Sequence, residues 1–147
     1  MKKILSVFAL ATMIIGCNGP NGSSSTATSK SSSAANMFKQ VGYFKDAKNN
    51  RVFTVSCKPA ATEAQVKSYA KKLSNTIGQM TAAYFYPEGS KIPADGVTMA
   101  RSSFAATDVI WDTPGLSSWD YVYMMPTIGE VTFVNCKERP GDDLCKK

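Results

Sequence analysis

Two stretches in the first half of the chain alternate between apolar and polar residues, which is typical of β-strands. The segment 38–44 is the weaker of the two, and 51–57 is the clearer. One face of the second strand would carry Phe53, Val55 and Cys57, and the other Val52, Thr54 and Ser56. Asp and Asn residues within 46–50 favour a turn between them. This pattern predicts a β-hairpin.

A helix is predicted to follow the hairpin. Thr62 and Gln65 have the spacing of a capping box, in which each residue's side chain bonds the other's backbone. Gly78 would stop the helix, because glycine favours the C-terminal turn. The buried face, at helical spacing, would carry Val66, Tyr69, Ala70, Leu73 and Ile77.

The rest of the domain reads as strand, helix and a second hairpin. A strand over 81–86 ends at Pro87, and a second, weaker helix lies somewhere within 95–106. The residues 107–111 fit neither pattern clearly. Strands are predicted over 119–125 and 130–136, joined by a turn that contains Pro126 and Gly129.

The order of these elements predicts the fold class α+β. We expect a four- to five-stranded sheet, largely antiparallel, with one or two helices packed on one face. The strand–helix–strand unit 51–86 could instead be a crossover with parallel strands, and the sheet would then be mixed.

The first residues of the chain have the features of a secretory signal. Lys2 and Lys3 precede an apolar run over 4–15, which is too short to span a bilayer and ends at Gly16 and Cys17. This ending resembles the lipobox of bacterial lipoproteins, although Ile14 and Ile15 stand where leucine and a smaller residue are more usual. The resemblance implies cleavage before Cys17 and lipidation of its thiol with palmitate-type chains.

The chain therefore divides into three parts. Residues 1–16 would be the lipoprotein signal peptide, 17–36 the lipidated cysteine with a flexible tether rich in Ser, Thr and Ala, and 37–147 a single α+β domain. The resemblance also implies a place in the bacterial cell envelope. In lipoproteins of Gram-negative bacteria, an aspartate after the cysteine tends to retain the protein at the inner membrane. Asn18 stands at that position, so the resemblance implies the outer membrane, facing the periplasm. The cell surface and the outer face of the inner membrane are the alternatives.

The composition limits the partners. The chain has a formal net charge of +6, and a modestly basic surface favours acidic partners such as lipid headgroups or cell-wall polymers. The lysines are scattered and do not form the basic stripe of a nucleic-acid binder, so no nucleic-acid partner is expected. The expected partners are the membrane, through the lipid anchor, and an envelope protein or cell-wall component.

The sequence offers little catalytic chemistry. The chain has no histidine, which excludes the Ser-His-Asp and Cys-His arrangements and removes the commonest metal ligand. The cysteine spacings do not match zinc sites, and no phosphate-binding or dinucleotide motif is present. Carboxylates are the remaining candidates for acid–base catalysis, and among them Asp108, Asp112 and Asp120 lie near tryptophans in the sequence. We therefore assign no catalytic residue, metal or cofactor.

Aromatic residues are the candidates for a binding surface. On a strand, Trp119, Tyr121 and Tyr123 would share one face, and Tyr84 and Tyr86 would share one face of another strand. An open face could stack on sugar rings or on a partner protein, whereas a face covered by helices would be core. The residues proposed for the surface are Trp111, Trp119, Tyr121 and Tyr123.

Three cysteines remain after Cys17, and export would place them in an oxidising compartment. Cys136 and Cys145 flank a short loop that contains a Pro-Gly turn, so we prefer this disulfide. Cys57 and Cys136 both end predicted strands, and a bridge between them is the alternative.

These features predict a non-enzymatic, membrane-anchored envelope lipoprotein that acts as a binding module. Two other hypotheses stay open. One is an exclusion or inhibitor lipoprotein of the kind that plasmids and phages encode. The other is a cell-wall enzyme that uses carboxylates.

Overall fold

The computed structural model describes residues 37–73 and 76–145. Cys17, the signal segment and the tether lie outside the described residues, so the structure does not test the predictions made for them. In chain order the elements are β1 (Phe38–Lys45), β2 (Arg51–Cys57), α1 (Glu63–Leu73), β3 (Thr81–Pro87), α2 (Ala94–Thr98), α3 (Ser103–Asp112), β4 (Tyr121–Met125), β5 (Thr132–Asn135) and a 3₁₀ turn, η1 (Asp143–Cys145).

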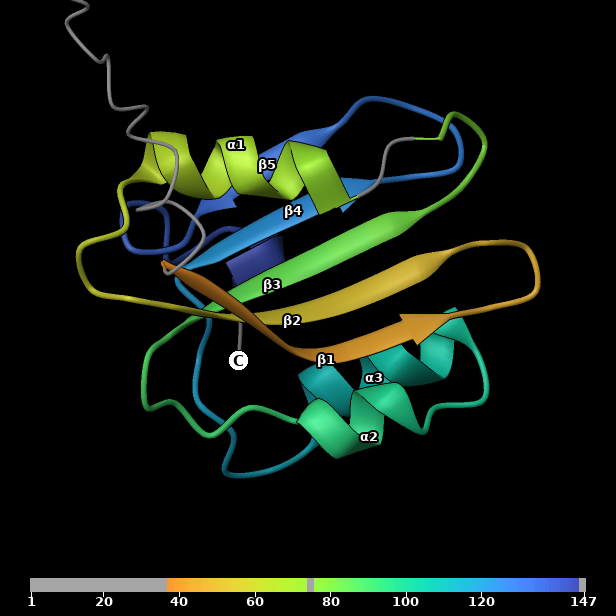
Figure 1. Ribbon diagram of the computed structural model, residues 1–147, viewed down its shortest axis with the longest axis horizontal. Helices are drawn as coiled ribbons and strands as arrows, with labels where there is room; N and C mark the ends of the chain where they lie inside the picture. The colour runs from red at the N-terminus through yellow and green to blue at the C-terminus, as the bar shows by residue number, and fades with distance from the viewer. Residues whose placement is uncertain (1–36, 74–75, 146–147) are drawn as a thin grey trace, which may run out of the picture.

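The strands form one five-stranded sheet in the order β1-β2-β3-β4-β5 (Figure 1). The pairs β1–β2, β3–β4 and β4–β5 are antiparallel, and β2–β3 is parallel, with α1 in the connection. The predicted α+β class, both hairpins and the parallel crossover are therefore confirmed. The sheet is mixed and mostly antiparallel.

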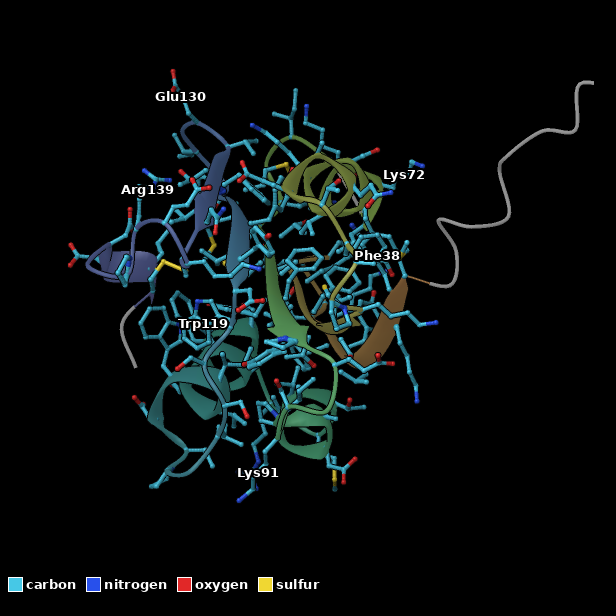
Figure 2. All side chains as sticks on the ribbon, turned by 90° about the vertical axis from the view of Figure 1, so that its left-hand side faces the viewer. Phe38, Lys72, Lys91, Trp119, Glu130 and Arg139 are labelled. Carbon is cyan, nitrogen blue, oxygen red and sulfur yellow. A yellow bond between two sulfur atoms is a disulfide. The ribbon has the colours of Figure 1, made fainter. Side chains whose placement is uncertain are left out.

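Helices cover both faces of the sheet, whereas the sequence analysis placed them on one. Helix α1 lies on one side, and α2 and α3 lie on the other (Figures 1 and 2). The reason is that both faces of the central strands are apolar, so both must be shielded from water. Val55 and Phe85 belong to the cluster under α1, whereas Val52 and Tyr84 belong to the cluster under α3.

The capping box of α1 is present. The Thr62 amide donates to Gln65 Oε1 at 2.9 Å, and the Gln65 amide donates to Thr62 Oγ1 at 3.3 Å. Val66 and Ala70 are buried against the sheet as predicted. The helix ends at Leu73, however, and does not reach Ile77.

Ile77 was predicted on the buried face of the helix, but it is 100% exposed. Gly78 does not end the helix itself. It has a φ of +85° and lies in the turn that leads to β3, a conformation that suits glycine.

The second helical region consists of two helices where one was predicted. Ser102 separates them, because its Oγ accepts the Ala105 amide at 3.1 Å and caps α3. The ambiguous residues 107–111 are helical. Within α3, Phe104 is exposed to solvent and Ile110 is buried in the core.

Gly42 allows α2 to lie close to the edge strand. It follows an irregularity in the β1–β2 register, and a Cβ atom there would lie 2.5 Å from Thr54 Oγ1 and 3.0 Å from the Ala94 carbonyl oxygen. Real Cβ contacts do not approach this closely, so the contact between α2 and β1 depends on glycine.

The sheet has two ends that differ in their connections. At the proximal end Phe38 pairs with Cys57, next to Met37, the first residue that the structure describes. At the distal end Arg51 pairs with Thr81, and Thr81 pairs with Met125. The distal end is on the right in Figure 1 and consists of the loops 45–51, 77–81, 99–104 and 125–132.

Candidate functional site

Four aromatic rings form an edge-to-face cluster on the α3 side of the sheet. The ring centroids of Tyr84 and Trp119 are 5.0 Å apart, and those of Trp111 and Trp119 are 4.9 Å apart. Tyr86 completes the cluster, 6.2 Å from Trp119. Trp119 is only 3% exposed, and Trp111 is half-buried. The cluster is part of the core.

The prediction that Trp119 shares one face with Tyr121 and Tyr123 is wrong. Strand β4 begins at Tyr121, so strand alternation does not extend back to Trp119. Tyr121 and Tyr123 are buried on the α1 face, and Trp119 is buried on the opposite face. The four proposed binding residues thus lie in two cores and form no single surface. Ligand binding by any one of them stays a prediction.

The phenols of the cluster are held in their neutral form. Burial raises the pKa of Tyr84 to about 12, although the hydrogen bond that Trp111 Nε1 donates to its hydroxyl oxygen at 2.9 Å opposes this. Burial, together with Tyr84, raises the pKa of Tyr86 as well. Tyr84 packs in the cluster and accepts a hydrogen bond, whereas the buried Tyr86 hydroxyl packs there without a hydrogen-bond partner. Neither phenol ionises near neutral pH.

The three candidate carboxylates do not come together in one pocket. Asp112 lines a cavity of about 300 Å³ formed by the loop after α3. Asp120 lines a different cavity, of about 210 Å³, at the proximal end. Asp108 is exposed on α3 and lines neither.

The proximal cavity brings a thiol near a paired lysine and aspartate. Lys137 Nζ lies 3.1 Å from Asp120 Oδ2 and 4.8 Å from the centre of the Tyr121 ring. Partial burial lowers the pKa of Lys137, but hydrogen bonding to Tyr121 and Asp120 outweighs this and leaves the pKa raised. Burial and the negative charge of Asp120 raise the pKa of the Cys57 thiol to about 12. The thiol is therefore protonated and a poor nucleophile.

The disulfide joins Cys136 and Cys145, as preferred from the sequence. Cys57 is free and buried. The alternative Cys57–Cys136 bridge is excluded by strand order, because β3 and β4 separate β2 from β5. The loop closed by the disulfide packs beside Trp119, whose indole nitrogen donates to the Leu144 carbonyl oxygen at 2.9 Å (Figure 2).

The distal end carries the large apolar side chains that are exposed in the described part of the chain. They come from separate loops and from the start of α3, and they are Ile77, Met99, Phe104, Ile128 and Val131. Ile77 is 100% exposed, Ile128 93% and Phe104 78%. This surface was not predicted from the sequence. The feature that could have indicated it is an isoleucine directly before a turn glycine, which occurs at Ile77-Gly78 and again at Ile128-Gly129.

Two grooves open on this distal surface. One, of about 360 Å³, lies between the loops that carry Ile77 and Ile128. The other, of about 340 Å³, is lined by Phe104 together with the basic residues Lys48 and Arg101. An apolar surface with basic neighbours can bind a partner that is both apolar and acidic.

Within residues 37–73 and 76–145, no group of three metal-ligating side chains is placed to hold an ion, and no helix is long and apolar enough to cross a membrane. Comparison of the chain with protein-family models, with curated proteins and with solved structures found no match.

Proposed function

We propose that this protein is a lipid-anchored envelope lipoprotein whose domain is a non-enzymatic binding module, and that it contacts another envelope component through its distal end. The observation that carries the proposal is the position of the exposed apolar side chains. They gather at the end of the sheet opposite Met37, where the tether joins the domain.

Exposure of these side chains is unfavourable in the free domain. Covering an isoleucine or phenylalanine side chain gains roughly 1.5–3 kcal/mol, so several exposed ones at one end of a domain favour an interaction there. Ile77, Ile128 and Phe104 are mostly exposed, so most of this free energy is not gained when the domain folds. It would be gained when a partner covers them.

The rival hypothesis of a cell-wall enzyme finds less support in the structure. Glycosidase-type chemistry uses two carboxylates on either side of one substrate bond. Asp112 and Asp120 line separate cavities, and Asp120 is already paired with Lys137. The distal surface is the better basis for a function.

Photo-crosslinking in the intact cell tests this proposal. A benzophenone amino acid is placed at position 128 of the full-length exported protein, and at position 118 in a matched control. Ser118 is exposed and lies in the loop before β4, at the proximal end. We expect a specific adduct from position 128 and not from 118. No adduct from position 128, or the same adducts from both positions, would contradict the proposal.

A further inference from the structure

We propose that the envelope component bound by the distal end is an anionic lipid bilayer, the same membrane in which the lipid anchor sits. The inference rests on the proposed function, since it assumes that the chain is anchored through Cys17. The acyl chains of the bilayer would contact the apolar side chains, and its phosphate headgroups would bind the basic ones.

The apolar side chains are arranged as separate tips. Ile77 comes from the loop before β3, Ile128 from the β4–β5 hairpin and Phe104 from the start of α3. The loop before β3, the β4–β5 hairpin and the start of α3 all lie at the distal end, and α3 is on the opposite face of the sheet from α1 (Figure 1). A bilayer can receive such dispersed groups because it does not require a complementary shape. In interfacial helices, aliphatic and aromatic side chains are buried at the boundary between headgroups and acyl chains, and the same chemistry is available to side chains on loops.

The charge of the distal end suits an anionic surface. Its basic residues are Lys45, Lys48, Arg51 and Arg101, and its acidic residues are Asp46 and Glu130. Asp46 keeps its negative charge, and these six side chains together give the distal end a formal net charge of +2.

The Asp46 carboxylate accepts hydrogen bonds from the Lys48 amide at 2.8 Å, from the Asn50 amide at 2.9 Å and from Ser103 Oγ at 3.1 Å. Lys48 and Arg101 line the groove beside Phe104. Each basic side chain held near an anionic leaflet strengthens binding about fivefold.

The tether is long enough to allow this contact although it joins the opposite end. The segment 17–36 has 20 residues, and so many residues span at most about 70 Å when extended. The strands β2 and β3 have seven residues each, which is about 23 Å of sheet. The chain can therefore pass alongside the domain. Because the lipid anchor is inserted in the same bilayer, the distal end meets the lipid surface at a high effective concentration.

Depth-dependent quenching tests the proposal on the full lipidated protein. Ile128→Cys carries an environment-sensitive thiol dye, and Ser118→Cys carries it in the control. The wild-type protein shows the background from Cys57, which is buried. The vesicles are phosphatidylcholine alone or mixed with phosphatidylglycerol, with bromine atoms on the acyl chains. We expect quenching at position 128 in anionic vesicles, severalfold above that at 118. Lys48→Gln should lower the ratio of docked to undocked domain about fivefold.

The outcomes are distinguishable. Quenching at position 128 no greater than at 118, in protein that floats with the vesicles, overturns the bilayer as partner but leaves the proposed function intact. Equal quenching in neutral and anionic vesicles overturns the role of charge. Protein that does not float at all overturns both the inference and the anchoring on which it rests. Because Ile128 is exposed, substitution there should not affect folding, and Ile77→Cys provides a second position.

Discussion

The indole nitrogen of Trp119 donates a hydrogen bond to the carbonyl oxygen of Leu144 at 2.9 Å, which attaches the C-terminal loop to the core. The disulfide between Cys136 and Cys145 closes the same loop. The loop is therefore held both covalently and by the most buried tryptophan of the described chain.

Removing the disulfide should weaken the domain without unfolding it. The bridge closes a loop with a sequence separation of nine residues. Closure of so short a loop contributes about 2.5 kcal/mol through the entropy of the unfolded chain. We expect the Cys136→Ala, Cys145→Ala double variant to lose up to this amount in urea titration followed by tryptophan fluorescence. Dithiothreitol should have a similar effect on wild type, and none on the double variant.

Stability should fall at alkaline pH because of Cys57. Its thiol ionises near pH 9 in the unfolded chain, and burial raises its pKa to about 12 in the folded domain. The buried neutral thiol therefore makes its full contribution to the free energy of unfolding below pH 9. This contribution is lost as the pH rises from 9 towards 12. The loss from this group is about 1.4 kcal/mol per pH unit in that window.

The comparison with Cys57→Ala isolates the thiol from the tyrosines, which also ionise at high pH. We expect the wild type to lose more stability than the variant between pH 8 and 10 in urea titrations. The thiol should also resist alkylation in the native protein and react on unfolding. Equal pH dependence of the two proteins would show that the thiol is not buried as described.

Much of the fold could be predicted where local chemistry determines structure. The capping box at Thr62 starts α1, and the Asp46 side chain closes the β1–β2 turn through Asn50. The placement of helices on both faces was missed because strand alternation shows which residues share a face but not what covers each face. Ser102 was not recognised as the cap that divides α2 from α3.

The candidate surface could not be predicted for a similar reason. Ile77 continues the helical spacing of α1, and only the end of the helix at Leu73 leaves it in solvent. Trp119 continues the alternation of β4, although the strand begins two residues later. Periodicity alone does not show where an element ends, and both errors have this origin.

The buried face of α1 should dominate its contribution to stability. Val66 is fully buried, and its truncation to alanine removes two methyl groups from the core. This should cost roughly 1.5–3 kcal/mol. Lys72→Ala, on the exposed side of the same helix, should change stability by less than about 0.5 kcal/mol. Similar values for both variants in urea titration would show that the helix face is misassigned.

Gly42 should not tolerate even a methyl group. The added Cβ would meet Thr54 Oγ1 and the Ala94 carbonyl oxygen, so α2 or β1 must move. We expect Gly42→Ala to cost roughly 1–3 kcal/mol through overpacking. Gly141→Ala is the control, since nothing lies within 4 Å of the Cβ that it would add. A neutral effect at Gly42 would mean that α2 packs more loosely than described.

The intact mass of the protein purified from bacterial membranes, for the wild type and for Cys17→Ala, tests the lipid anchor directly. We expect the wild type to lack residues 1–16 and to carry acyl groups on Cys17, and the variant to carry no lipid and to be either uncleaved or released from the membrane. An unmodified Cys17 in membrane-bound wild type, or lipid attached to the Cys17→Ala variant, would show that the protein is not a lipoprotein.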